Sequence, residues 1–80
     1  MDTATVERLI ETGIPEAEAE VTTPRNPDDA HFAATVVSPA FAGEPLVDRH
    51  QRVYDALDEH MTDDIHAIEL TAYTPEEYEG

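Results

Sequence analysis

The sequence predicts an α+β fold, a two-layer sandwich in which helices cover one face of a three-stranded mixed sheet. Three observations predict it: stretches with the apolar period of helices, short stretches with strand character, and their order along the chain, α-β-β-α-β-α. At 80 residues the chain has room for one domain, which we expect to span residues 1–80.

The first half of the chain reads as a helix followed by a hairpin. Within residues 3–14 apolar residues recur at the spacing of one helical face: Val6, Leu9, Ile10 and Ile14. Gly13 is expected to stop this helix, with Pro15 beyond it. Residues 17–23 alternate strictly, with glutamates on the side that should face water, which indicates a half-exposed strand. Prolines, asparagine and aspartates in residues 24–29 favour a chain reversal.

The second strand is expected from His31 to Ser38, because the run Phe-Ala-Ala-Thr-Val-Val suits a central strand. Ser38 and the proline after it can cap one short turn, after which Phe41 packs back onto the core and Gly43 releases the chain. The longest helix is predicted over residues 46–61, where one stripe is apolar: Leu46, Val47, His50, Val53, Tyr54, Leu57 and Met61.

The last two elements are a strand and a short helix. Residues 65–73 alternate and carry β-branched and aromatic side chains, which favours a third strand. Thr74 and Glu77 then form the pattern of a capping box, with Pro75 at the first helical position. Because a helix joins the second and third strands, these two should be parallel, while the first two form an antiparallel hairpin that leaves the second strand in the middle.

The charge of the chain is strongly biased. Four arginines and no lysine stand against 19 acidic residues, a net charge of −15. Since self-repulsion of this kind is screened in concentrated salt, we expect a halophilic cytosol, with an acidic mesophile domain as the alternative. The absence of cysteine from the sequence excludes disulfides, thiolate metal sites and cysteine nucleophiles within it. No apolar run approaches the ~20 residues of a membrane span, and the chain is expected to be cytoplasmic.

Histidines are expected to gather at one edge of the sheet. His31 opens the second strand and His66 the third, and parallel neighbours begin at the same edge. His60 should arrive there from the end of the long helix. Imidazole nitrogen binds iron, copper, nickel and zinc, although spacing alone favours a hydrogen-bonded role for His31 and His66. A lone metal held by these two would bind weakly.

Other candidate residues have structural interpretations. His50 shares its stripe with core residues and is expected to be a packed histidine with one partner. His60 suits a helix C-terminus when protonated. Tyr54 and Phe41 are expected in the core. No constellation of nucleophile and base stands out, so the sequence predicts a protein that is not an enzyme.

Several separated segments, taken in this order, resemble the BolA-like family over residues 6–78. They are His31-Phe32, Val36-Val37-Ser38, Phe41-Ala42-Gly43, Arg49-His50-Gln51-Arg52-Val53-Tyr54, Ile65-His66-Ala67-Ile68 and Tyr73-Thr74-Pro75. The resemblance is to a highly acidic, haloarchaeal-type member. It implies a type II K-homology fold and a cytosolic adaptor, monomeric when alone, that partners a monothiol glutaredoxin or a similar thiol carrier in iron homeostasis.

The resemblance also implies a site. His66 is similar to the ligand that this family contributes to a [2Fe-2S] cluster shared with the glutaredoxin, so no cofactor is expected in the isolated chain. In some members a histidine or cysteine between the first two strands is a second ligand, but residues 22–29 contain neither, and His31 is the candidate to replace it. The expected partner surface comprises Pro24, Arg25, Asn26, Pro27, His31 and His66.

Some members resemble transcriptional regulators, which keeps a nucleic-acid alternative open. It would use Arg49 and Arg52 on the long helix, where Asp48 and Asp55 bracket them and leave no net positive stripe. The Gly-X-X-Gly loop with which K-homology modules clamp a nucleic-acid backbone does not occur in the sequence. A net charge of −15 adds repulsion at low salt.

Overall fold

A computed structural model describes residues 2–23, 31–58 and 67–79, and it has the predicted order of helices and strands. The turn predicted at 24–29 and the start of the third strand at 65–66 lie outside the described residues. The long helix, predicted to reach residue 61, ends at Leu57, with Asp58 as its C-cap at φ 45°. The elements are α1 (Thr3–Gly13), β1 (Glu18–Thr22), β2 (His31–Val37), η2 (Pro39–Phe41), α2 (Leu46–Leu57), β3 (Ala67–Tyr73) and α4 (Pro75–Glu79).

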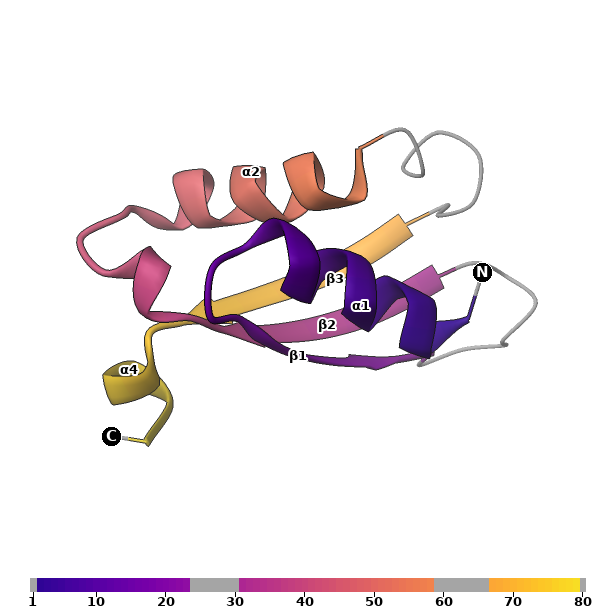
Figure 1. Cartoon of the computed structure of the whole chain (residues 1–80), viewed down its shortest axis with the longest axis horizontal. Helices are drawn as coiled ribbons and strands as arrows, with labels where there is room; N and C mark the ends of the chain where they lie inside the picture. Colours follow the sequence, from indigo (N-terminus) through magenta and orange to yellow (C-terminus); the bar gives the residue numbers. More distant parts are fainter. Residues whose placement is uncertain (1, 24–30, 59–66, 80) are drawn as a thin grey trace.

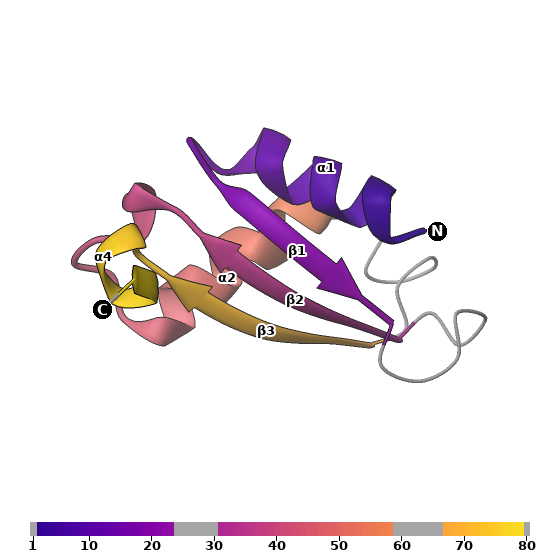
Figure 2. The ribbon, with the colours of Figure 1, turned by 90° about the horizontal axis from the view of Figure 1, so that it is seen from below.

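The three strands form one sheet in the order β1-β2-β3. β1 and β2 are antiparallel, with Val21 opposite Ala34, and β2 and β3 are parallel, with Phe32 opposite Ile68. Figures 1 and 2 show α1 and α2 on one face of this sheet and the other face uncovered, while α4 lies beyond the end of β3. The predicted mixed sheet and two-layer arrangement are confirmed.

The core lies between the sheet and the two long helices. Val21 faces inward, as the alternation of the first strand predicted, and Phe32 and Val36 of β2 are buried beside it. Phe41 of η2 has none of its surface exposed. Ser38 caps η2 by accepting a hydrogen bond from the Ala40 amide at 3.1 Å. None of the helices in the described ranges combines the length and apolarity needed to cross a bilayer.

Gly13 has a different role from the one its position suggested. It is the last residue of α1 rather than a stop beyond it, and Ile14 is the C-cap. A Cβ on Gly13 would lie 2.6 Å from the Cβ of Ala56 in α2. The glycine is therefore needed for the close approach of two helices. A positive φ is found at Gly43, at 78°, and also at Glu16 and Asp58, at 55° and 45°.

The stripe predicted for the long helix is partly wrong. Leu46, Val47 and Tyr54 are 62%, 74% and 38% exposed, so Tyr54 is not a core residue. The buried residues of α2 are instead Arg49, Val53 and Leu57, at the i, i+4, i+8 spacing of one face. His50 is half-buried at the border between the two faces. One arginine thus lies on the buried face of α2, at a position that the predicted apolar stripe did not include.

Candidate functional site

The edge of the sheet where β2 and β3 begin is the predicted cluster site. The backbone of His31 occupies the first position of β2, and its Cα is paired with that of Ala67, the first residue of β3. Ala67 directly follows His66 in the sequence. The predicted parallel pairing of these two strands is confirmed by this register, while the residues that precede His31 and Ala67 lie outside the described ranges.

The other residues of the predicted site cannot be placed. His66, His60 and the partner-surface residues Pro24, Arg25, Asn26 and Pro27 lie outside the described residues. Within residues 2–23, 31–58 and 67–79, no three side chains of histidine, cysteine, aspartate or glutamate lie close enough together to hold a metal. The metal-ligand predictions for His66 and His31 therefore stay predictions.

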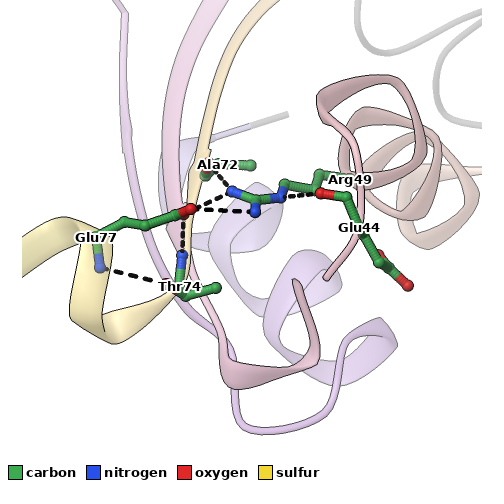
Figure 3. Close-up of polar contacts among 5 residues, drawn as sticks. All are labelled: Glu44, Arg49, Ala72, Thr74 and Glu77. Atoms are coloured by element: carbon green, nitrogen blue, oxygen red, sulfur yellow. Dashed lines mark hydrogen bonds and ion pairs between the residues drawn. The ribbon is translucent and has the colours of Figure 1, made fainter. Parts of the chain in front are cut away.

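At the opposite end of the sheet, the buried Arg49 is at the centre of a polar cluster (Figure 3). Its Nε donates to the carbonyl oxygen of Glu44 at 2.9 Å, and its Nη1 donates to the carbonyl oxygen of Ala72 at 3.2 Å. The two Nη atoms also donate to both carboxylate oxygens of Glu77, at 2.6 and 3.2 Å. Its guanidinium carbon lies 5.9 Å from the centre of the Phe41 ring. Arg49 therefore connects α2, β3 and α4.

Glu77 has a second function in the same cluster. Its Oε1 accepts a hydrogen bond from the amide of Thr74 at 2.9 Å, and its own amide donates to the Thr74 hydroxyl at 3.2 Å, which is the predicted capping box. Hydrogen bonds from the Arg49 guanidinium and then from the Thr74 amide lower the pKa of Glu77 to about 2. The carboxylate is thus ionised at every pH at which α4 is expected to be docked.

This cluster changes the interpretation of the two arginines proposed for nucleic acid. The Arg49 side chain is only 9% exposed, so its guanidinium is not available to a phosphate in this conformation. Arg52 is 42% exposed, but both its Nε and its Nη2 donate to the Glu44 carboxylate, at 2.8 to 3.0 Å. Hydrogen bonding to Arg52 lowers the pKa of Glu44. The two arginines therefore do not form one exposed cationic face.

Two glutamates of α1 have a function that the sequence did not suggest. Oε2 of Glu11 accepts a hydrogen bond from the amide of Ala19 at 3.0 Å, and Oε2 of Glu7 accepts one from the amide of Val21 at 2.9 Å. Glu7 and Glu11 are four residues apart, which places them on the same side of the helix. This spacing was visible in the sequence, but 19 acidic residues make any one pair uninformative.

A shallow pocket of about 340 Å³ lies between the uncovered face of the sheet and α4. Its lining includes three carboxylates and the ring of Tyr78, which is 5.6 Å from the ring of Tyr73. It lies where the strands β2 and β3 end, whereas His31 is at their start. The pocket is therefore separate from the predicted cluster site.

Comparisons with known proteins agree on the family to which this chain is similar. The family model described as BolA-like protein matches residues 14–77. The DNA-binding transcriptional regulator BolA of Escherichia coli (strain K12) is 38% identical over 52 residues, which is 65% of this chain and 50% of that protein. The match thus spans about half the length of this curated relative.

Solved structures agree over nearly the whole chain. A bolA protein homologue from Coxiella burnetii is 40% identical, covers 100% of this chain and 99% of its own, and superposes with a TM-score of 0.86. The BolA domain of SufE1 from Arabidopsis thaliana is 34% identical, with 94% and 93% of the two chains covered and a TM-score of 0.79. With its family match, its sheet order and its helix arrangement, this chain belongs to the BolA-like family.

Proposed function

We propose that this chain is a non-enzymatic adaptor that partners a monothiol glutaredoxin, or a similar thiol carrier, and supplies His66 to a shared [2Fe-2S] cluster. The role would be in iron-sulfur trafficking or iron homeostasis. Membership of the BolA-like family supports the adaptor role, because that resemblance implies such partners. One solved relative is a BolA domain of a protein named SufE1, so the same fold is also used as one module of a longer chain.

The observation that carries the proposal is the parallel register that pairs His31 with Ala67. It brings the residue that follows His66 in the chain next to the only histidine near the first inter-strand loop in the sequence. Two imidazoles would leave part of a cluster's coordination to be filled by other ligands. Because the sequence has no cysteine, the thiolates must come from the partner.

The chemistry of the ligands is consistent with a cluster held by imidazole from this chain and by thiolates from the partner. Imidazole is a good ligand for iron, and histidine in place of thiolate on one iron of a [2Fe-2S] cluster raises its reduction potential. A cluster bound at one end by His66 would therefore differ in potential from one held by four thiolates. Such a partner needs reduced thiols, which is the reason for placing the role in the cytoplasm. We propose that the isolated chain is a monomer without cofactor.

The experiment is reconstitution of the cluster with a monothiol glutaredoxin in molar salt, followed by visible absorption and circular dichroism. His66→Ala is expected to change both spectra and to weaken the complex, and His31→Ala to do so only if it is the second ligand. His50→Ala is the matched control, because His50 is a half-buried imidazole of α2. If His66→Ala leaves the spectra and the stability of the complex unchanged, the assignment of the ligand is wrong.

The second candidate is a nucleic-acid-binding regulator, which the name of the Escherichia coli relative favours. Burial of Arg49 and pairing of Arg52 with Glu44 weigh against it, as does the net charge of −15. A titration with duplex DNA at rising salt separates the two. The adaptor proposal expects no tight complex at molar salt, whereas tight binding there that Arg52→Ala abolishes would favour the regulator.

A further inference from the structure

The two outer edges of the sheet are not equivalent. β1 and β3 are both edge strands, because β2 lies between them. An edge strand has backbone N–H and C=O groups that no neighbouring strand satisfies, and such groups pair readily with another extended chain. The hydrogen bonds of the described residues show which of these groups are already paired on each edge.

On the β1 edge the donors are already used. The amides of Ala19 and Val21 point away from β2, and each donates to a carboxylate of α1, from Glu11 and Glu7 respectively. These carboxylates occupy the positions that the carbonyl groups of an added strand would take. The β1 edge is therefore protected by the chain itself.

On the β3 edge the direction of each residue follows from one hydrogen bond. The amide of Ser38 donates to the carbonyl oxygen of Tyr73 at 3.0 Å, so Tyr73 bonds toward β2. Since bonding directions alternate along a parallel strand, Ile68, Leu70 and Ala72 direct their backbone groups outward. The bond from Arg49 to the carbonyl oxygen of Ala72 agrees with this and blocks that end of the edge.

The outward backbone groups of Ile68 and Leu70 accept or donate no side-chain hydrogen bond within the described ranges. Several of the usual protections of an edge are missing from the strand: its seven residues include no proline or lysine, their one charged side chain is Glu69, and the pairing with β2 has no bulge. The side chains of Ile68 and Leu70 are only partly buried. This short segment combines unpaired backbone with half-covered apolar side chains.

We propose that the outer edge of β3 at Ile68 and Leu70 is a docking edge for an extended, basic segment of a partner protein, which adds to the sheet as a fourth strand. Backbone pairing selects an extended polypeptide, and the half-buried Ile68 and Leu70 select apolar side chains on the face that carries the helices. On the other face the added strand lies beside exposed Glu69, which selects arginine or lysine.

The charge of the whole chain selects the same partner. In dilute salt a second copy would bring another net charge of −15 to this edge, whereas a basic segment is attracted to it. In molar salt the close contact with Glu69 is the charge interaction that still favours a basic segment. The proposal goes beyond the shared cluster, because strand addition needs neither a metal nor His66. Its failure would leave the proposed function standing, and loss of the His66 effect would leave the edge proposal standing.

The test uses the full chain, labelled with nitrogen-15, in molar salt. The probe is the peptide acetyl-Val-Arg-Val-Arg-Val-Arg-Val-amide. It has two N-methylated twins, one methylated at the valines and the other at the arginines. Because N-methylation removes the backbone N–H, each twin can pair with a neighbouring strand along only one of its own two sides. At saturation we expect hydrogen exchange of the Ile68 and Leu70 amides to slow by about tenfold or more, which corresponds to about 1.4 kcal/mol. One twin should bind and the other should not.

The amides of Ala19 and Val21 are the internal control, and their exchange should not change. Unchanged exchange at Ile68 and Leu70 would overturn the proposal, and so would equal binding of both twins, which would mean attraction by charge alone. If the Ile68 and Leu70 amides are already protected in the free chain and the chain has a doubled mass in solution, the edge is occupied by a second copy. This result would also overturn the proposal. Glu7→Ala with Glu11→Ala should make the β1 edge bind the peptide as well.

Discussion

At the scale of single residues, the partners of a side chain decide its role more than its type does. Arg49 and Arg52 are three positions apart on α2, yet one is buried among backbone carbonyls and a carboxylate, and the other is paired at the surface. The difference is set by Glu77, which is 28 residues from Arg49 in sequence. In the sequence, the only indication that Arg49 is buried was its spacing of four residues from Val53 and eight from Leu57.

The ion pair of Arg49 and Glu77 predicts a pH dependence of stability. The pKa of Glu77 in the folded chain, about 2, lies below its ordinary value of 4.5. Its stabilisation is therefore fully present above about pH 4.5 and is lost as the pH falls toward 2. The melting temperatures of the parent and of Glu77→Gln should differ by a constant amount above pH 4.5 and converge below it.

Glu76→Gln is the matched control, because it removes the same charge from the neighbouring exposed residue of α4. Its difference from the parent should lack the convergence between pH 4.5 and 2 that Glu77→Gln shows. Thermal melts followed by circular dichroism in molar salt measure both. A gap between parent and Glu77→Gln that stays constant down to pH 2 would mean that the ion pair does not form in solution.

At the scale of elements, local patterns predicted which helices and strands form and in what order. The alternation of β1, the cap at Ser38 and the capping box at Thr74 are all found as expected, because each depends on residues within a few positions. The buried face of α2 was not predicted correctly. Leu46 and Val47, in the first turn of the helix, are exposed despite being apolar, and the buried face contains Arg49.

The predicted site could be recovered only in part. The parallel pairing of β2 with β3, which brings His31 beside Ala67, follows from the helix that joins the two strands, and it is found. The position of the His66 side chain depends on residues outside the described ranges, so its assignment depends on the family resemblance. The protection of the β1 edge by Glu7 and Glu11 needed the docking angle of α1, which the sequence does not contain.

The contact between Gly13 and Ala56 predicts that Gly13→Ala destabilises the chain. Alanine usually stabilises a helix by up to about 1 kcal/mol relative to glycine. Here its Cβ would lie 2.6 Å from the Cβ of Ala56, and such overpacking typically costs about 1–3 kcal/mol. Urea unfolding should therefore give a lower free energy of unfolding for Gly13→Ala, and Ala56→Gly in the same chain should recover part of the loss.

The rescue separates a steric effect from one on the end of the helix. Ala56→Gly alone is measured as well, because glycine within α2 itself costs up to about 1 kcal/mol. If the effects of the two substitutions simply add, Ala56 is not the obstacle. A stabilising Gly13→Ala would mean that α1 and α2 lie farther apart in solution than their 2.6 Å contact implies.

At the scale of the whole molecule, charge and topology act together. α1 and α2 cover one face of the sheet, and the uncovered face carries the exposed glutamates Glu18, Glu20 and Glu69. Of the four arginines, Arg49 and Arg52 are already held by Glu77 and Glu44. Little cationic charge is left to offset the acidic surface, so the compact state is opposed by repulsion that salt can screen.

Salt should therefore raise the stability of the folded chain. Between about 0.1 M and about 1 M potassium chloride the Debye length falls from about 10 Å to about 3 Å, which removes most repulsion between exposed carboxylates. The melting temperature should rise over this range, on a scale where a gain of about 1 kcal/mol corresponds to about 4–8 °C for a chain of this size.

A triple variant tests the source of this dependence. Glu18→Gln, Glu20→Gln and Glu69→Gln together remove three charges from the uncovered face without touching the ion pairs of Arg49 and Arg52. Its melting temperature should be higher than that of the parent at low salt. The two melting temperatures should approach each other at molar salt, because screening then weakens the same repulsion that the substitutions remove. Sucrose is the neutral control, since it stabilises by exclusion from the surface and should raise both equally. Equal salt dependence in both chains would mean that the charge of this face is not what salt acts on.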